Sequence, residues 1–325
     1  MMARSGPIAA ILLVVGIVLP WLPFVYPVVA IDLICFALFA VSLDLLFGFV
    51  GLLSFGQALF WGGGGYLAAI TLAHTHVDGA IAIVIGVAYA VVLAAIVGAI
   101  AVRRAGIYFA MITLGVAQIQ YFSAFQLTDI TGGENGLNLG SRGTLFGIGM
   151  ENDRLYYYVA LVLIALAVWF AVRLVNSPFG GVLRAMRENE TRAIALGYRV
   201  NRYKLAVFTI AGGLAGLAGA LYAIGNHLAG LEMVDWHTSG AVVMMTVLGG
   251  IGTIFGPIVG ATLFESLDYF VSKMQAFTVF GITIPSIGQE TNMVMGFVFA
   301  LCVLLFRRGI VGELLARLAK RPGSS

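Results

Sequence analysis

Residues 176–204 read NSPFGGVLRAMRENETRAIALGYRVNRYK, a basic stretch inside an otherwise apolar chain. It holds five arginines and one lysine but only two glutamates. Apolar runs long enough to cross a bilayer lie on both sides of it. We therefore expect a chain that crosses a membrane several times. This stretch, called the basic loop below, should face the cytoplasm, where the loops of membrane proteins concentrate lysine and arginine.

The composition excludes a soluble protein. Of 325 residues, 61% are hydrophobic and only 10% are charged, whereas soluble domains carry about 25% charged residues. A soluble fold of this size could not hide so much apolar surface. Glycine, with 42 residues, suits the close approach of membrane helices. The expected fold class is therefore all-α, a polytopic membrane protein.

Polar and turn residues divide the chain into about ten expected transmembrane helices, some of them short or broken. The run from Thr238 to Tyr269 is too long for one span, and glycines and Pro257 interrupt it. We expect this break to lie buried at the centre of the molecule, because irregular backbone at membrane depth needs protein or water around it. The expected spans of this single domain, residues 1–325, are 8–26, 28–47, 52–73, 80–101, 106–126, 155–175, 203–226, 238–251, 254–272 and 286–306.

The placement of charges orients these spans. An even number, ten, puts every basic cluster and both termini on one side, the cytoplasm. The opposite loops lean acidic. The longest of them, residues 127–154, is dense in Gly, Asn, Thr and Asp, which favour turns, and we expect it to be periplasmic.

Within the basic loop, the pattern predicts a helix from Val182 to Leu196 that Gly197 ends as a C-cap. Arg184, Glu188 and Arg192 stand four residues apart, a spacing that allows two ion pairs along one helix. The residues alone leave two interpretations open. The helix either docks on a protein partner or rests on anionic lipid.

Several blocks of this sequence, taken together, resemble one protein family. RAMRENE at 184–190, followed by ALGY at 195–198, resembles the cytoplasmic loop of bacterial ABC-importer permeases of the branched-chain amino acid (LivM-like) family. The resemblance runs in order from about residue 40 to 265. The other matching blocks are GLLSFGQA at 51–58, GIYFAMITL at 106–114, TGGENGL at 131–137, AGLAGAL at 215–221 and LGGIGT at 248–253, followed by Gly256 and Pro257.

The resemblance implies the permease subunit of an ATP-driven importer of branched-chain or related amino acids in a bacterial inner membrane, working by alternating access. The implied partners are a second related, LivH-like permease, two cytoplasmic ATPase subunits, a periplasmic substrate-binding protein and membrane lipid; nucleic acid is not among them. The chain lacks the G-x-x-x-x-G-K-[ST] motif that holds nucleotide phosphates. We therefore expect no enzyme activity, no metal and no cofactor in this chain, with ATP and Mg²⁺ bound by the partner subunits.

The expected site residues, none of them catalytic, form three groups. The coupling helix seated on the ATPase is expected to use Arg184, Arg187, Glu188, Asn189, Glu190, Arg192 and Gly197. The substrate pathway, where hydroxyl and free backbone groups bind a zwitterion, is expected at Ser54, Gln57, Thr113, Gly249, Gly250, Gly252 and Thr253. Contact with the binding protein is expected at Gly132, Gly133, Glu134 and Asn135.

Two questions stay open at this stage. The first question is the substrate, because relatives with similar blocks carry urea, short amides or aromatic acids. The second question is the class of function, because an ion-coupled secondary transporter or a channel is the alternative. A secondary transporter needs charged coupling groups near the bilayer midplane, and such charges are nearly absent here. A channel is disfavoured because the basic loop has no evident function in it.

Overall fold

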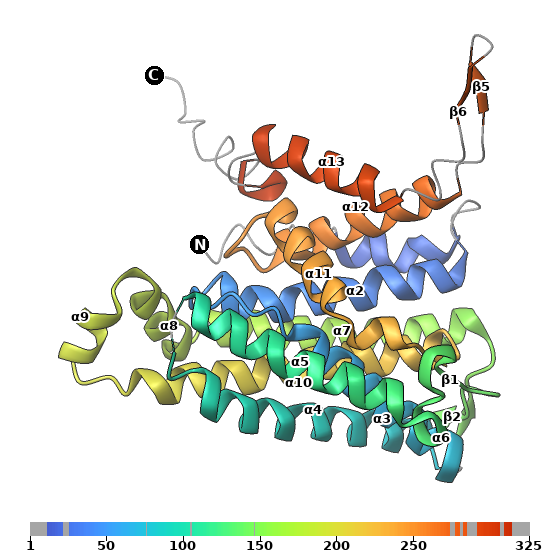
Figure 1. The fold of residues 1–325 in the computed structure, drawn as a ribbon, viewed down its shortest axis with the longest axis horizontal. Coiled ribbons are helices and arrows are strands. Elements are labelled where there is room, and N and C mark those ends of the chain that lie inside the picture. The colour runs from blue at the N-terminus through green and yellow to red at the C-terminus, as the bar shows by residue number, and fades with distance from the viewer. Residues whose placement is uncertain are drawn as a thin grey trace.

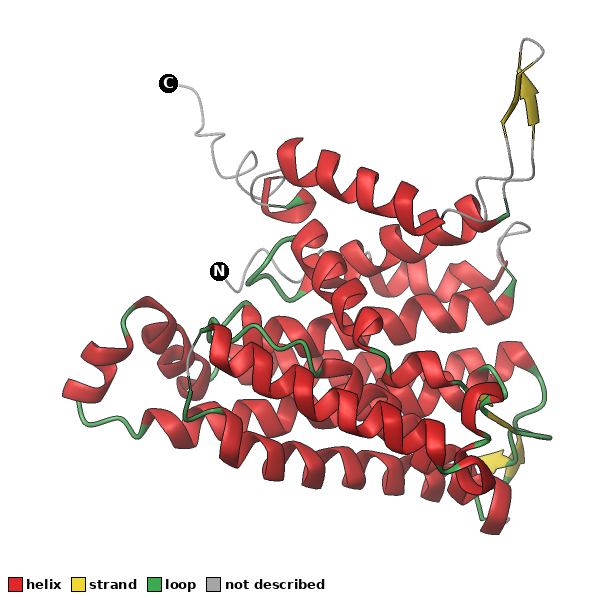
Figure 2. Ribbon diagram, in the orientation of Figure 1, coloured by secondary structure: helices red, strands yellow, loops and turns green. Residues whose placement is uncertain are grey.

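Helices packed side by side make up most of the structure, as expected for an all-α polytopic membrane protein. The computed structural model describes residues 12–21, 26–75, 77–104, 106–145, 147–273, 277–279, 282–284, 291–305 and 309–313. The connecting loops gather at the two ends of the bundle, and the short strands lie outside it (Figure 2).

Five helices of the described residues are long and apolar enough to cross a membrane. Their bounds lie close to the expected spans. They are α2 (Pro27–Phe47), α4 (Gly79–Ala101), α5 (Ile107–Gln126), α7 (Asp153–Val175) and α10 (Val200–Gly225). Most of α2 and α10 is buried, whereas α4, α5 and α7 turn large apolar faces outward. Those faces suit contact with lipid or with another membrane subunit.

The remaining expected spans correspond to shorter helices. The first expected span is represented by the helix Leu12–Trp21, whose last turn is the 3₁₀ helix η1 (Leu19–Trp21). Parts of the first and last expected spans, residues 8–11, 22–25, 286–290 and 306, lie outside the described residues. The other helices of this group are α3 (Gln57–Thr75), α11 (Trp236–Gly249), α12 (Phe255–Ser272) and α13 (Thr291–Leu305).

The third span differs from expectation at its start. Residues 51–56 form no helix, and α3 begins only at Gln57. Gly51 has a φ of 82°, a conformation that glycine adopts without strain. Leu52 and Ser54 are nevertheless buried. An irregular segment therefore lies inside the protein, where neighbouring helices shield its backbone from lipid.

The break between α11 and α12 exists as expected, but it does not lie at the centre of the molecule. The Gly252 N–H donates to Asp44 Oδ1 at 2.8 Å, and Asp44 belongs to the last turn of α2. The break thus lies toward one end of the bundle. The reason is the length of α11, which has 14 residues and carries the chain toward that end before the glycines interrupt it.

Small residues let α3, α4 and α10 approach one another closely. A side chain at Gly64 of α3 would meet the backbone of Gly216 on α10, and one at Gly219 would meet the carbonyl group of Trp61 on α3. A side chain at Gly216 would also meet Ala90 on α4. Without a hydrophobic force between helices in lipid, this close van der Waals packing holds α3, α4 and α10 together.

The two ends of the bundle carry different small elements (Figure 1). One end holds the helices of the basic loop, α8 (Pro178–Glu188) and α9 (Glu190–Ala195). The opposite end holds α6 (Thr128–Thr131), η2 (Gly133–Asn135), β1 (Leu137–Asn138), β2 (Thr144–Leu145), β3 (Ile148–Gly149) and β4 (Leu228–Ala229). After β4, η3 (Leu231–Val234) packs against α3 with Met233 and Val234 buried. In antiparallel pairs, β1 joins β4, β2 joins β3, and β5 (Phe277–Val279) joins β6 (Ile282–Ile284).

The glycine contacts predict the effect of a single methyl group. Gly219→Ala places a Cβ against the Trp61 carbonyl, and overpacking of this kind costs about 1–3 kcal/mol. We expect a lower thermal unfolding midpoint in detergent micelles. The matched control is Gly115→Ala on α5, where a Cβ meets nothing within 4 Å and where alanine favours the helix. Equal midpoints for the two variants would contradict the packing argument.

Candidate functional site

The basic loop forms two helices rather than the single helix expected over 182–196. Asn189 separates α8 from α9 with an extended backbone, and its Oδ1 accepts a hydrogen bond from the Arg192 N–H at 2.9 Å. Asparagine is a strong N-cap, and this cap overrides the helical periodicity. The ion pairs of the described residues include neither Arg184–Glu188 nor Glu188–Arg192. The expected end is correct, because Gly197 has a φ of 87° and terminates α9.

Part of the expected coupling group lies on the outer surface of this loop. Arg184, Glu188, Asn189, Arg192 and Gly197 are exposed, and α8 and α9 extend beyond the end of the bundle (Figure 1). These residues are accessible to a partner at this end.

Two of the expected residues, Arg187 and Glu190, make contacts within the chain, although Arg187 is itself exposed. Arg187 donates through Nη1 to the Gly48 carbonyl at the end of α2. Glu190 Oε1 forms an ion pair with Lys204 Nζ at 2.7 Å, and Lys204 is only 4% exposed. Arg187 therefore joins α8 to α2, while the Lys204 pair joins α9 to α10.

Sequence reasoning missed two exposed apolar side chains of this loop. Ile194 is 56% exposed and Leu196 is 70% exposed, which is unusual beside so many charges and is typical of an interaction surface. Beyond them lies a groove of about 440 Å³, lined by Gly197, Tyr198, Arg199, Arg202 and Tyr203. The signal in the sequence was the presence of Ile194 and Leu196, two apolar residues, in an otherwise polar loop.

Three of the expected pathway residues lie together inside the bundle. Ser54, Gln57 and Thr113 are at most 1% exposed, and a side chain at Gly56 would meet the backbone of Thr113. The Gln57 Oε1 is buried without a hydrogen-bond partner among the described residues. A buried acceptor left unpaired is costly, so this oxygen is free to accept a hydrogen bond from a bound molecule.

Two serines that sequence reasoning missed complete this cluster. Gln57 Nε2 donates to Ser42 Oγ on α2 at 3.2 Å. The Ala58 N–H donates to Ser239 Oγ on α11 at 2.9 Å. We call Ser42, Ser54, Gln57, Thr113 and Ser239 the polar cluster. It joins α2, α3, α5 and α11 through neutral groups.

The other four expected pathway residues belong to the break between α11 and α12. Thr253 Oγ1 donates to the Gly250 carbonyl at 2.7 Å, and a side chain at Gly249 would meet the backbone of Gly256. A side chain at Gly252 would meet Arg187 Nη1 at 3.0 Å. These residues therefore adjoin α8 of the basic loop. They connect to the polar cluster through α2, which carries both Ser42 and Asp44.

The third expected group lies at the end of the bundle opposite α8 and α9 (Figure 1). Gly132 and Gly133 have φ values of 76° and 59°, and the Gly133 N–H donates to Thr131 Oγ1 at 3.3 Å. This turn leaves Glu134 and Asn135 exposed.

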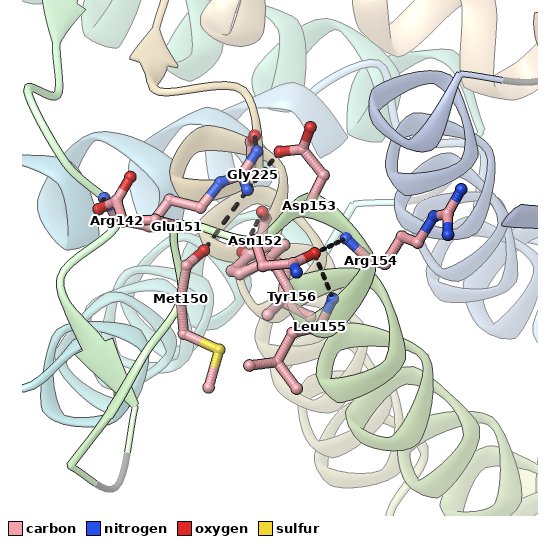
Figure 3. Close-up of polar contacts among 10 residues, drawn as sticks. Arg142, Met150, Glu151, Asn152, Asp153, Arg154, Leu155, Tyr156 and Gly225 are labelled. Carbon is pink, nitrogen blue, oxygen red and sulfur yellow. Dashed lines mark hydrogen bonds and ion pairs between the residues drawn. The ribbon is translucent and has the colours of Figure 1, made fainter.

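A buried arginine anchors this end of the molecule. Arg142 is 1% exposed, and its guanidinium contacts Asp153 Oδ1 and donates to the Gly225 carbonyl, both at 2.6 Å. It also lies 5.0 Å from the centre of the Tyr156 ring. Figure 3 shows Arg142 reaching from the loop to the first turn of α7 and the end of α10. The sequence offered only one signal, a lone arginine among glycines and serines.

Comparison with known proteins shows similarity over most of the chain. A family model described as a branched-chain amino acid transport system permease component matches residues 28–306. The high-affinity branched-chain amino acid transport system permease protein LivM of Escherichia coli (strain K12) is 30% identical over 251 residues, which is 70% of this chain and 59% of that protein. The chain thus spans about three fifths of that relative's length.

Two further relatives are more distant. The probable branched-chain amino acid transport permease protein LivM of Methanocaldococcus jannaschii is 24% identical over 311 residues, covering 84% of this chain and 89% of that protein. The ribose import permease protein RbsC of Bacillus subtilis (strain 168) is 27% identical over 178 residues, covering 53% of this chain and 50% of that protein.

The Arg142 contacts predict a large loss of stability on truncation. Arg142→Ala leaves the buried Gly225 carbonyl without its donor, and we expect a decrease of about 2–3 kcal/mol in the free energy of unfolding. Chemical denaturation in micelles measures this change. Arg154→Ala, an exposed arginine in the same region, is the control and should change stability by less than about 1 kcal/mol. Similar losses for both variants would exclude Arg142 as the anchor.

Proposed function

Because this chain belongs to the family of branched-chain amino acid transport system permease components, we propose that it is the membrane-spanning subunit of an ATP-driven ABC importer. Its proposed substrates are branched-chain or related amino acids, taken into the cytoplasm by alternating access. The observation that carries the proposal is the basic loop, which extends beyond the bundle with exposed apolar side chains beside arginines.

The basic loop is the proposed seat of the ATPase. Ile194 and Leu196 would enter an apolar groove on a cytoplasmic ATPase subunit, with Arg184 and Arg192 facing acidic side chains around it. The chain carries no phosphate-binding motif of its own. Two ATPase subunits therefore bind Mg²⁺ and ATP and hydrolyse the ATP, and the permease itself catalyses no reaction.

The opposite end is the proposed dock for a periplasmic substrate-binding protein. Glu134 and Asn135 are exposed there on a fixed turn, and the Arg142 contacts hold the neighbouring loop in place. In this proposal the basic loop and both termini lie in the cytoplasm, and the membrane is the inner membrane of a bacterium. A second related, LivH-like permease would pack against an outward apolar face.

The polar cluster is the proposed substrate pathway. Its hydroxyl and amide groups can exchange hydrogen bonds with the ammonium and carboxylate groups of a zwitterion without placing a full charge in the membrane. The free Gln57 Oε1 is the acceptor offered to an ammonium group. Urea, a short amide or an aromatic acid would use similar hydrogen bonds, so the binding protein carries most of the selection.

Reconstitution tests this function directly. The chain, a LivH-like permease and the two ATPase subunits are placed in liposomes with the binding protein, and uptake of labelled leucine is measured. We expect uptake to require both ATP and the binding protein. Uptake by this chain alone, driven by an ion gradient, would instead show a secondary transporter. Binding of leucine, urea, acetamide and phenylalanine to the binding protein identifies the substrate class.

The docking surface makes a second prediction. Burying a leucine side chain contributes about 1.5–3 kcal/mol, so we expect Leu196→Asp to weaken binding of the ATPase subunit at least about tenfold. Ile148→Asp is the control, because Ile148 is also exposed, at 56%, but lies at the opposite end. Binding is measured by co-purification at several ATPase concentrations. Unchanged binding of the Leu196 variant would remove this residue from the docking surface.

A further inference from the structure

Transport driven from the basic loop needs a mechanical connection between that loop and the polar cluster around Gln57. One buried carboxylate, that of Asp44, lies between them. Asp44, in the last turn of α2, is 1% exposed. Its Oδ1 accepts the Gly252 N–H at 2.8 Å, across 208 residues of sequence. Its Oδ2 is buried and has no hydrogen-bond partner among the described residues. A buried carboxylate that is only half satisfied is costly.

Arg187 of the basic loop carries the N–H donors that Asp44 Oδ2 lacks. Its side chain lies beside the same groups, because a side chain at Gly252 would meet Arg187 Nη1 at 3.0 Å, yet Arg187 and Asp44 are not among the ion pairs within 4.0 Å of the described chain. Arg187 instead donates to the Gly48 carbonyl, one turn beyond Asp44. A guanidinium has five N–H donors and binds a carboxylate in bidentate geometry. The Arg187 guanidinium and Asp44 Oδ2 are thus neighbours that form no hydrogen bond with each other.

Two glycines occupy the space around these groups. A side chain at Gly48 would collide with Asp44 Oδ1 and with the Gly252 nitrogen, and one at Gly252 would meet Arg187 Nη1 at 3.0 Å. Gly252 has a φ of 79°, which side-chain-bearing residues rarely adopt. The absence of side chains lets α2, Arg187 of α8 and the break between α11 and α12 approach one another closely.

We propose that Asp44 and Arg187 form a latch with two states, a role that rests on the proposed ATPase-driven transport. In the state seen here, Arg187 holds the Gly48 carbonyl and Asp44 holds the Gly252 amide. In the other state, movement of α8 by the ATPase brings the Arg187 guanidinium onto Asp44 Oδ2. Because Asp44 also binds the break between α11 and α12, forming this pair shifts α11, which carries Ser239 of the polar cluster.

Amide replacements separate the latch from a fixed structural role. Asp44→Asn keeps an oxygen acceptor for the Gly252 amide while losing the charged pair. Arg187→Gln also removes the charge, but its side chain is two atoms shorter and loses the reach to the Gly48 carbonyl. If Asp44 only holds this structure, the Asp44 variant transports like the wild type.

The experiment measures leucine uptake per ATP hydrolysed by the complete complex in liposomes. We expect each single variant to lower this ratio at least about tenfold, and the double variant to be no worse than the poorer single variant, because both remove one shared interaction. Arg173→Gln and Asp129→Asn, outside the latch, are the matched controls. Ratios within twofold of the wild type, or effects that multiply in the double variant, would overturn the latch.

Arg187→Lys provides a second comparison if an amide variant assembles poorly. Lysine keeps the charge but not the bidentate geometry, so we expect it to retain more coupling than the glutamine variant. Equal losses for lysine and glutamine would also overturn the latch. Failure of the proposed function itself has a different signature, since the wild-type complex would then show no ATP-dependent uptake.

Discussion

The hydrocarbon interior of a bilayer offers no hydrogen-bond partners to a polypeptide backbone, and the structure follows from that constraint. Helices satisfy their own backbone groups, which is why the apolar runs of this chain are helical. Two segments depart from this rule, residues 51–56 before α3 and the break between α11 and α12. Both are partly buried, and side chains replace the missing helical bonds, as Asp44 does for Gly252. Ser54, Asp44 and Thr253 lie at or beside these two departures.

The buried helix α2 brings the candidate sites together. Within two turns, Ser42 contacts Gln57 of the polar cluster, Asp44 binds the break at Gly252, and Gly48 accepts from Arg187 of the basic loop. Two turns of helix span about 10 Å. A displacement of the basic loop therefore acts on the same short segment that supports the polar cluster. Glycines permit close packing among α3, α4 and α10 in the rest of the bundle.

The sequence predicted where helices form in the basic loop, but two local preferences competed there. The periodicity of residues 182–196 predicted one helix, whereas the capping strength of Asn189 divided it into α8 and α9. The arginines drew attention to the charged face of this loop, while Ile194 and Leu196 became evident only when their exposure was known. Arg142 looked like an ordinary loop residue, since nothing near it in sequence announces the Gly225 carbonyl that it binds.

The sequence by itself determined the membrane class, the bounds of the longest spans, the cap at Gly197 and the interruption after Gly249, because hydropathy and helix-breaking residues act on neighbours along the chain. Only the tertiary structure decided that Gln57 meets Ser42, that Arg187 binds the end of α2, and that the break lies beside the basic loop rather than at the centre. The Arg187–Gly48 and Gly252–Asp44 contacts join residues 139 and 208 positions apart. Contacts of that range depend on which helices pack together, and packing is set by the shape of whole helix faces rather than by any short stretch of residues.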